Sequence, residues 1–454
     1  MIPLAELRPT RGELREMMRI AAPIVLAQVG MMLMGVVDTA MVGRVSPEAI
    51  AAVALAHIYW ANLFLAALGL LLVLDPVVSQ AVGARDRVGI ARGVQRGVIM
   101  AVALSVLMSL ALIPGRWLFT VLRQPEDVIP ITATVAHWLI PGVLPSLLFV
   151  VFRQTLQAMG KARAIVISIV VANVLNALLN WVLIYGHWGF PAMGPAGSAI
   201  STVIGRWVML AIIVAGGWRA LIPTLSPWRP ESFATAPMMR MLHLGLPVAF
   251  QQWLEIAVFA LGGIVIGTFG SVPLAGHEIV LNLASITFMV PLGVGAAAAA
   301  MVGRAIGRDD VAAARRDAVA ALSVGVGFMA LTTVAFTAAP ALIAGWFAAD
   351  AATVAFSASL LPIAGLFQIF DGMQCVSAGV LRGTGDTRVP MLLHLGGFWG
   401  VGIPLCLLLT FPLGLGPKGV WWGFVASLIV VAVLQMNRMR WRLAQDIKRL
   451  HFDH

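Results

Sequence analysis

Three acidic residues lie inside long apolar stretches of this sequence, where an unpaired charge is costly. Asp38 belongs to the stretch GVVDTAMVGR, and Glu255 and Asp371 belong to two later apolar stretches. A charged side chain at the centre of a bilayer costs roughly 2.5 to 3.5 kcal/mol even on lenient insertion scales, so such residues usually face a protein interior or a wet cavity. We therefore regard the three carboxylates as candidate binding groups for a proton, Na⁺ or a larger cation.

Amides and aromatic rings accompany two of these acids at helical spacing. The residues on the same helix face as Glu255 are Gln251, Gln252 and Phe259, and those near Asp371 are Phe367, Gln368, Gln374 and Cys375. Residues three or four apart lie on one face of a helix, so each acid is expected on a polar stripe beside an aromatic ring. The alternative is a structural hydrogen bond between helices, with no part in binding.

Asp38 has possible partners on its own stretch and on another one. Gln28, Gly35 and Thr39 lie on the same stretch as Asp38, and a later stretch carries Asn173, Asn176 and Asn180 at spacings of three and four residues. This spacing places the asparagines on one helix face. We expect Asn176 and Asn180 to belong to a network with Asp38, although asparagines also join membrane helices for structural reasons alone.

Other polar residues in the apolar stretches have plainer expected roles. His57 and His277 recur with Asn62 and Asn282 at matching places in the two halves, which favours packing. Long cationic side chains can extend along a helix to reach polar surroundings, so Arg206 is expected to reach the membrane surface and Arg153 the cytoplasm. Asp75 and Glu278 lie near the ends of their stretches.

The elements that must position these residues are membrane-spanning helices. The chain has 454 residues, of which 60% are hydrophobic and 11% charged, and a mean hydropathy of +0.94. About 20 apolar residues are needed to cross a bilayer as a helix, and irregular backbone cannot face lipid. The sequence therefore predicts an all-α membrane protein with about twelve spans, near 20–42, 50–74, 93–113, 128–157, 164–186, 196–217, 241–269, 274–302, 317–338, 353–381, 389–411 and 419–437.

Charge in the connecting loops predicts the orientation. Basic residues gather in alternate loops, whereas the intervening loops hold only Arg44, Arg116, Arg123 and Lys418. By the positive-inside rule both termini are expected in the cytoplasm of a bacterial inner membrane protein. The net charge of +10 is then explained without nucleic acid. No removable signal peptide is expected, and Cys375 and Cys406 lie within spans and predict no disulfide.

The sequence also repeats itself. PIVLAQ echoes PVAFQQ, AHIYWAN echoes GHEIVLN, QAVGARD echoes RAIGRDD, LQAMGKAR echoes LRGTGDTR, and GPAG echoes GPKG, all in the same order. Two halves of six spans follow, and because six is even both halves cross the membrane in the same sense, around a pseudo-two-fold axis along the membrane normal. We predict an N-terminal lobe of residues 1–225 and a C-terminal lobe of residues 226–454, joined by a proline-rich linker.

Taken together, VVDTAMVGR, NALLNWVLIYG, the stretch around Glu255 and FQIFDGMQCVSAGVLRGTGD resemble the MATE family, the multidrug and toxic-compound extrusion transporters, and most closely its NorM branch. The resemblance runs roughly from Pro23 to Trp422. It implies twelve helices in two six-helix lobes around a cleft, and export of organic cations in exchange for Na⁺ or H⁺.

The resemblance also implies roles for single residues. Asp38 is implied as the acid of the N-terminal lobe with Asn176 and Asn180, and Glu255 with Asp371 as the cation site of the C-terminal lobe and candidate Na⁺ ligands. Two positions depart from the family pattern: Asn180 stands where the DinF-like branch usually has aspartate, and Phe367 where some relatives have tyrosine. The full set of candidate ion-coupling or substrate residues is Asp38, Glu255, Asp371, Asn176, Asn180, Gln28, Gln252, Gln368 and Phe367.

A buried carboxylate that can be neutralised by a coupling ion or by a cationic drug, but not by both, predicts antiport. The alternatives are a flippase for a lipid-linked saccharide, which would need cationic residues for phosphates, and a passive channel. An enzyme is not expected, because neither a nucleophile beside a base nor a metal-binding spacing is evident. We expect a monomer in contact with membrane lipids, with small organic cations as substrates, Na⁺ or H⁺ as coupling ion and no further cofactor.

Overall fold

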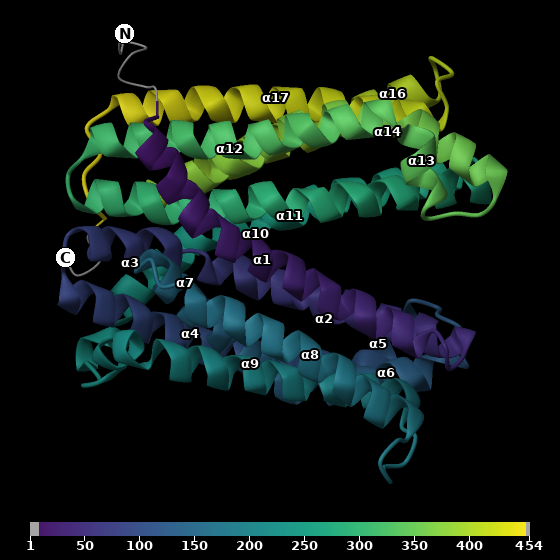
Figure 1. Ribbon diagram of the computed structural model, residues 1–454, viewed down its shortest axis with the longest axis horizontal. Coiled ribbons are helices and arrows are strands. Elements are labelled where there is room, and N and C mark those ends of the chain that lie inside the picture. The colour runs from purple at the N-terminus through teal and green to yellow at the C-terminus, as the bar shows by residue number, and fades with distance from the viewer. Residues whose placement is uncertain (1–8, 451–454) are drawn as a thin grey trace. The chain divides into compact units, whose positions relative to one another are not determined.

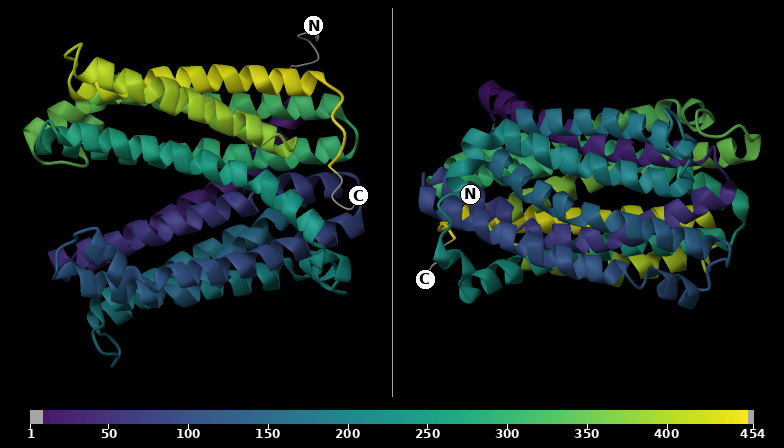
Figure 2. Two further views of the ribbon diagram at one scale, coloured as in Figure 1. Left: turned by 180° about the vertical axis from the view of Figure 1, so that it is seen from behind. Right: turned by 90° about the horizontal axis from the view of Figure 1, so that it is seen from below.

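The computed structural model of the protein describes residues 9–450, and within this range it contains helices and no strands. Twelve segments of the described chain are long and apolar enough to cross a membrane. Each coincides with one of the twelve predicted spans, and most extend several residues further at one or both ends. The predicted all-α membrane fold is therefore confirmed. Figure 1 labels most of the helices, and Figure 2 shows them from behind and from below.

Up to Leu225, the described chain contains nine α-helices and a short 3₁₀ turn. They are α1 (Arg11–Val42), α2 (Pro47–Leu71), α3 (Leu74–Gly83), α4 (Arg87–Leu112), α5 (Gly115–Val121), α6 (Val128–Leu139), η2 (Ile140–Gly142), α7 (Val143–Ala158), α8 (Arg163–Tyr185) and α9 (Gly194–Leu225). All of these except α5 belong to the first six spans. The second span is broken between α2 and α3, and the fourth between α6 and α7. The sequence predicted the second span to end at residue 74, where α3 begins, and the fourth span to be continuous.

The last six spans follow a second 3₁₀ turn, η3 (Pro230–Phe233). Their helices are α10 (Thr235–Gly267), α11 (Ser271–Gly307), α12 (Val311–Ala338), α13 (Pro340–Gly345), α14 (Ala351–Gly383), α15 (Arg388–His394), η4 (Leu395–Gly402), α16 (Ile403–Thr410) and α17 (Pro417–Ala444). The eleventh span contains a π-helical segment, η4, with four glycines. Two of these, Gly397 and Gly402, leave no room for a side chain because Val431 and Ser427 of α17 lie against them.

The internal duplication is visible in the turns as well as in the sequence. Arg85 and Asp309 both have positive φ, of 56° and 59°, a conformation uncommon outside glycine. The next residue in each copy caps a helix: Asp86 accepts a hydrogen bond from the amide of Gly89, and Asp310 accepts one from the amide of Ala313, each at 2.8 Å. In each copy the chain therefore reverses direction in the same way, and an aspartate at the equivalent position caps the next helix.

We expect Asp86→Ala and Asp310→Ala each to lower the free energy of unfolding by about 1 kcal/mol, because each leaves a helix N-terminus without its cap. Thermal unfolding of the purified protein in detergent measures this. Asp127→Ala is the matched control, because Asp127 precedes α6 in the same position but its side chain makes no cap hydrogen bond. Equal effects of all three substitutions would contradict the assignment.

Two short helices that the sequence did not predict also occupy matching places. The helix α5 follows the third span of the first half, and α13 follows the third span of the second half. Both begin directly after or at a proline, at Pro114 and Pro340. They are too short for a helical period to be visible in the sequence, but their positions agree with the duplication.

The described chain divides into two compact units, which we describe separately. The N-terminal unit is Leu26–Gly245, and the C-terminal unit consists of the residues up to Val25 together with those from Leu246 onward. In the N-terminal unit α8 lies beside α9, and in the C-terminal unit α11 lies beside α14. These boundaries differ from the predicted division between residues 225 and 226.

Hydrogen bonds explain why the linker stays with the N-terminal unit. The side-chain amide of Gln95 on α4 donates to the carbonyl oxygens of Thr224 and Pro227, at 3.1 Å each. Its oxygen accepts from the amide of Arg229 at 3.0 Å and from the hydroxyl of Ser232 at 2.7 Å. One buried glutamine thus fixes the proline-rich segment against α4.

About the first four turns of α1 pack with the C-terminal unit for equally local reasons. Glu13 forms an ion pair with Arg316 on α12, with 2.6 Å between Oε1 and Nε. Behind this pair, Met17, Ile20 and Ile24 are buried in a core cluster with residues of α11, α12, α14 and α17. Burial of these apolar side chains holds the start of α1 in the C-terminal unit, although α1 belongs to the first half of the sequence.

Candidate functional site

Two of the predicted acids meet in the C-terminal unit. Gln374 on α14 donates hydrogen bonds from Nε2 to Oε1 of Glu255 on α10, at 2.9 Å, and to Oδ1 of Asp371, one turn away on α14, at 3.1 Å. A single amide group therefore joins the two carboxylates. The sequence placed Gln374 beside Asp371 but did not include it among the candidate site residues.

A histidine that the sequence analysis did not single out completes this group. Nε2 of His394, at the end of α15, lies 3.7 Å from Oε2 of Glu255 and 3.2 Å from Nε2 of Gln251. Its Nδ1 lies 3.0 Å from the carbonyl oxygen of Pro390 and 2.9 Å from Nε2 of Gln435. The available signal was a histidine inside an apolar span directly before the glycine-rich π-helical segment.

The site is enclosed on the side of Asp371 and less so on the side of Glu255. Asp371 and His394 are buried, whereas the side chain of Glu255 keeps 15% of its accessible surface. Asp371 is therefore enclosed by the helices of its unit, as expected for a functional acid in a membrane, whereas one edge of Glu255 remains accessible.

Three other candidates of this unit do not join the two acids. Phe367 packs edge-to-face against Phe259 and Trp421, with ring centroids 5.8 and 5.7 Å away. Gln368 is hydrogen-bonded to Thr287 of α11 and to Thr332 of α12. Gln252 is half-buried on α10. Within the described residues, the amide of Gln374 binds Glu255, and the amides of Gln251 and Gln435 lie against His394.

A second polar group surrounds Asp38 in the N-terminal unit. Asn180 on α8 donates from Nδ2 to Oδ1 of Asp38 at 2.6 Å, and Thr202 on α9 donates to Oδ2 at 2.8 Å. The same Nδ2 of Asn180 lies 3.3 Å from Oδ1 of Asn176. All four side chains are buried, so the structure brings Asp38, Asn176 and Asn180 together as expected and adds Thr202, which the sequence analysis did not consider.

Gln28, the remaining candidate, lies elsewhere on α1. Its Oε1 accepts a hydrogen bond of 3.2 Å from Nη1 of Arg153 on α7. The ten residues between Gln28 and Asp38 correspond to about 15 Å along a helix axis. Arg153 is buried and interacts electrostatically with Asp75. Gln28 therefore belongs to a separate polar group, and the expectation that Arg153 extends to the cytoplasm is wrong.

Arg206 also differs from its expectation. It is 9% exposed and does not extend to the membrane surface, because its guanidinium carbon lies 3.7 Å above the ring centre of Trp60 on α2. A guanidinium over an indole face is a favourable cation–π arrangement. Arg206 and His57 both interact electrostatically with Asp38, so His57 is part of the surroundings of this acid.

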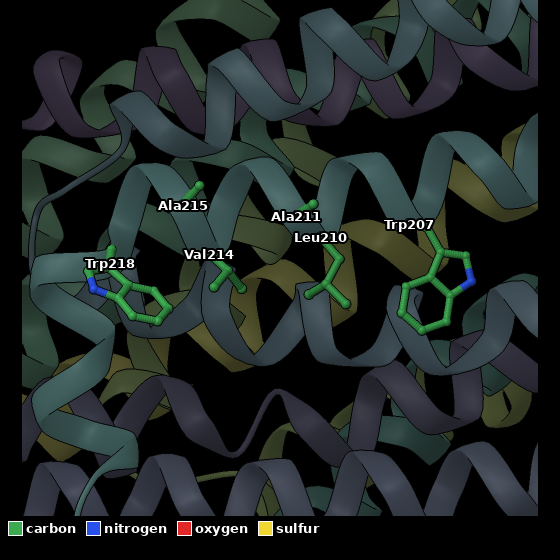
Figure 3. Close-up of a pocket in the computed structure, with 6 residues that line it drawn as sticks. All are labelled: Trp207, Leu210, Ala211, Val214, Ala215 and Trp218. Carbon is green, nitrogen blue, oxygen red and sulfur yellow. The ribbon is translucent and has the colours of Figure 1, made fainter.

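An apolar hollow along α9 is distinct from both acid groups. It is lined by Trp207, Leu210, Ala211, Val214, Ala215 and Trp218, and Figure 3 shows the two indoles at its ends with Leu210 and Val214 between them. Helical geometry turns most of these residues, although not Leu210, away from the face that carries Thr202 and Arg206. Both indoles are exposed, and none of the six lining residues offers a carboxylate to a cation.

The two acid groups are chemically suited to hold a positively charged ligand. Carboxylate and amide oxygens are hard ligands that suit hard cations. Within the described residues, no group of three or more His, Cys, Asp or Glu side chains is arranged to hold a metal ion. A cation at this site would therefore be held by the carboxylates of Glu255 and Asp371, which the amide of Gln374 joins; two such groups suit a monovalent ion, a proton or an organic cation.

Comparison with known proteins shows the family of this chain. The family model described as MatE matches the chain twice, over residues 23–182 and 247–408. The chain belongs to the MatE family. The two matched segments begin at Pro23 and Pro247, where the echoed motifs PIVLAQ and PVAFQQ also begin, so each half of the duplication matches the MatE model once.

Relatives and solved structures agree with this membership. The chain is 37% identical over 433 residues to the "Multidrug resistance protein NorM" of Burkholderia vietnamiensis, covering 93% of this chain and 92% of the relative. It is 34% identical over 448 residues to the "Probable multidrug resistance protein NorM" of Rhizobium meliloti (strain 1021), covering 96% and 94%. These matches support the NorM branch of the MatE family.

Similar structures show the same fold at low identity. The crystal structure of the eukaryotic MATE transporter AtDTX14 has a TM-score of 0.85 and 20% identity, covering 96% of this chain and 98% of the other. An outward-facing multidrug resistance MATE family transporter of the MOP superfamily has a TM-score of 0.87 and 18% identity, with 98% of both chains covered. The MatE fold therefore extends over nearly the whole chain.

Proposed function

We propose that this protein is a secondary active multidrug efflux transporter that exports organic cations in exchange for Na⁺ or H⁺ by alternating access. Its membership in the MatE family, with NorM relatives over nearly the full length, makes it a transporter and not an enzyme. The observation that carries the cation proposal is the pair of carboxylates, Glu255 and Asp371, held together by Gln374 inside an apolar bundle.

The mechanism follows from competition for these carboxylates. A bound coupling ion neutralises the negative charge that an organic cation needs, and a bound organic cation neutralises the charge that the coupling ion needs. Occupation by one guest therefore disfavours the other. To drive a change between inward-open and outward-open states, each guest must bind the two states with different free energies, because a ligand that binds both equally shifts nothing.

Location and assembly are proposed on the same basis. The alternation of basic loops favours cytoplasmic termini in a bacterial inner membrane. Membrane lipids contact the exposed apolar faces, and we expect a functional monomer, because both acid groups are formed entirely by side chains of this chain. The flippase alternative is disfavoured, because the two buried groups present carboxylates where a lipid-linked phosphate would need cations.

Dye efflux from proteoliposomes under separately imposed gradients tests the proposal. An organic cation such as ethidium is loaded, and a Na⁺ gradient or a pH gradient is imposed in turn. We expect efflux against the dye gradient with at least one of the two ions. A rate of dye efflux that changes with neither the Na⁺ gradient nor the pH gradient would contradict the proposed function. Movement of a lipid-linked sugar without movement of dye would also contradict it.

A further inference from the structure

The two acid groups differ in net charge, because among the residues that the structure describes an arginine interacts with Asp38 and none is found to interact with Glu255 or Asp371. Glu255 and Asp371 act on each other as like charges, so this group is doubly negative when both are ionised. Asp38 instead interacts with Arg206, so their opposite charges offset one another. Coulomb interactions inside a protein are screened less than in water, so this difference affects any cation that approaches.

Arg206 is held beside Asp38 by the helix that also binds Asp38. Thr202, which donates to the carboxylate of Asp38, lies four residues before Arg206 on α9, so both project from the same face. Trp60 stacks on the guanidinium. Gly142 closes another side, because a Cβ there would lie 3.2 Å from both Cδ and Nη1 of Arg206. The charge is thus fixed in place by α2, η2 and α9.

The guanidinium is not satisfied by this packing. Arg206 is more than nine-tenths buried, and its Nη1 is buried without a hydrogen-bond partner. A buried donor without a partner is costly. The carboxylate of Asp38 receives hydrogen bonds from Asn180 and Thr202 instead. The positive charge of Arg206 therefore interacts with Asp38, while the carboxylate oxygens of Asp38 accept hydrogen bonds from other residues.

We infer that Arg206 determines the cation affinity of the Asp38 group: it is a resident positive charge that weakens the binding of an organic cation at Asp38, leaving Glu255 and Asp371 as the stronger cation site. This inference rests on the proposed function. Removing the charge of Arg206 would convert Asp38 into an isolated buried carboxylate, which attracts a cation more strongly. Trp60 assists by holding the guanidinium over its ring and away from the carboxylate.

Binding of radiolabelled tetraphenylphosphonium to the purified protein in detergent, measured by equilibrium dialysis at fixed pH without Na⁺, tests the inference. Glu255→Gln and Asp371→Asn are first combined, so that Asp38 is the remaining acid of the two groups. In this background we expect Arg206→Gln to raise the affinity about tenfold or more, and Arg206→Lys, which keeps the charge, to change it much less. Adding Asp38→Asn should abolish the gain.

A second variant tests the inference with the arginine intact. In the same background without the charges of Glu255 and Asp371, Trp60→Leu frees the guanidinium to approach Asp38, so it should weaken tetraphenylphosphonium binding, which is the opposite sign to Arg206→Gln. Arg153→Gln is the matched control, because it removes another buried arginine of the same unit, one that is bonded to Gln28. This control should leave the affinity unchanged.

The outcomes separate this inference from the proposed function. If the unaltered protein does not bind tetraphenylphosphonium, the proposed function and the inference are both overturned. If the unaltered protein binds it but Arg206→Gln gives no increase in the acid-depleted background, or the increase persists with Asp38→Asn, the inference alone is overturned. If Arg206→Gln does not fold, a Trp60→Leu protein with unchanged affinity overturns it.

Discussion

Asp371→Asn, and separately Glu255→Gln, should reduce ion-driven dye efflux to the level of protein-free vesicles while the protein still folds. Each substitution keeps the shape of the side chain and its capacity to bond with Gln374, but removes the negative charge for which the coupling ion and the organic cation compete. Because the hydrogen bonds are kept, we expect the free energy of unfolding to change by no more than about 1 kcal/mol. Efflux from proteoliposomes and thermal unfolding in detergent measure the two quantities.

Glu278→Gln serves as the control for this prediction. Glu278 is an acid on α11 whose side chain is exposed, so its replacement removes one negative charge without altering the buried pair. We expect it to retain efflux. If Asp371→Asn and Glu255→Gln both retain full efflux under the ion gradient that drives the unaltered protein, the assignment of the C-terminal acids is wrong.

Asp38→Asn is the second substitution with a large expected effect. Asn180 and Thr202 hold the carboxylate of Asp38 in a buried position, and an asparagine fits the same space without the charge. We expect loss of dye efflux under either gradient together with near-normal stability. Asp38→Ala should also lose efflux, but it should lower the free energy of unfolding by about 1 to 3 kcal/mol, because Asn180 and Thr202 would lose their acceptor in a buried place.

The contrast between these two variants separates a charge from a structural hydrogen bond. A purely structural Asp38 predicts that Asp38→Asn keeps efflux and only Asp38→Ala loses it. Thr202→Val provides a further check, because it removes one hydrogen bond to Asp38 but leaves the charge. It should give partial efflux, and complete loss in Thr202→Val with normal efflux in Asp38→Asn would contradict our account of this group.

The membrane helices could be predicted from sequence because the physics that selects them is simple. A helix that crosses a bilayer needs a run of apolar residues of known length, and twelve such runs are visible in the chain. The duplication was visible because the turns of both halves need the same residues: Gly160 and Gly385, in two of the echoed motifs, both have positive φ, of 70° and 81°. The ends of helices were less clear, because helices continue beyond the bilayer.

Scarcity of charge identified the acids, but helical spacing alone did not identify their partners. Gln368 and Gln374 flank Asp371 at three residues on either side, so both are equally plausible from sequence. Packing decides between them: Gln368 is bonded to Thr287 and Thr332, whereas Gln374 reaches Glu255. Gln28 lies on the same helix as Asp38, but this did not make it a partner of Asp38, because the two residues are too far apart along α1.

The residues that were missed or wrongly placed have contacts that are set only by tertiary structure. His394 is distant in sequence from both acids and has no repeated or periodic pattern around it, yet the fold places it 3.7 Å from Glu255. Arg206 is long enough either to reach a membrane surface or to remain buried, and its spacing from Thr202 is informative only once Thr202 is known to bind Asp38.

The central claim is that the coupling ion and the organic cation compete for the carboxylates of Glu255 and Asp371. The most direct measurement is the apparent dissociation constant of tetraphenylphosphonium for the purified unaltered protein, determined at increasing Na⁺ concentration and, separately, at decreasing pH. We predict that the apparent dissociation constant rises in proportion to the coupling ion while the number of sites stays constant, and that this dependence disappears in the Glu255→Gln, Asp371→Asn protein. An affinity that is independent of both Na⁺ and pH would contradict the account.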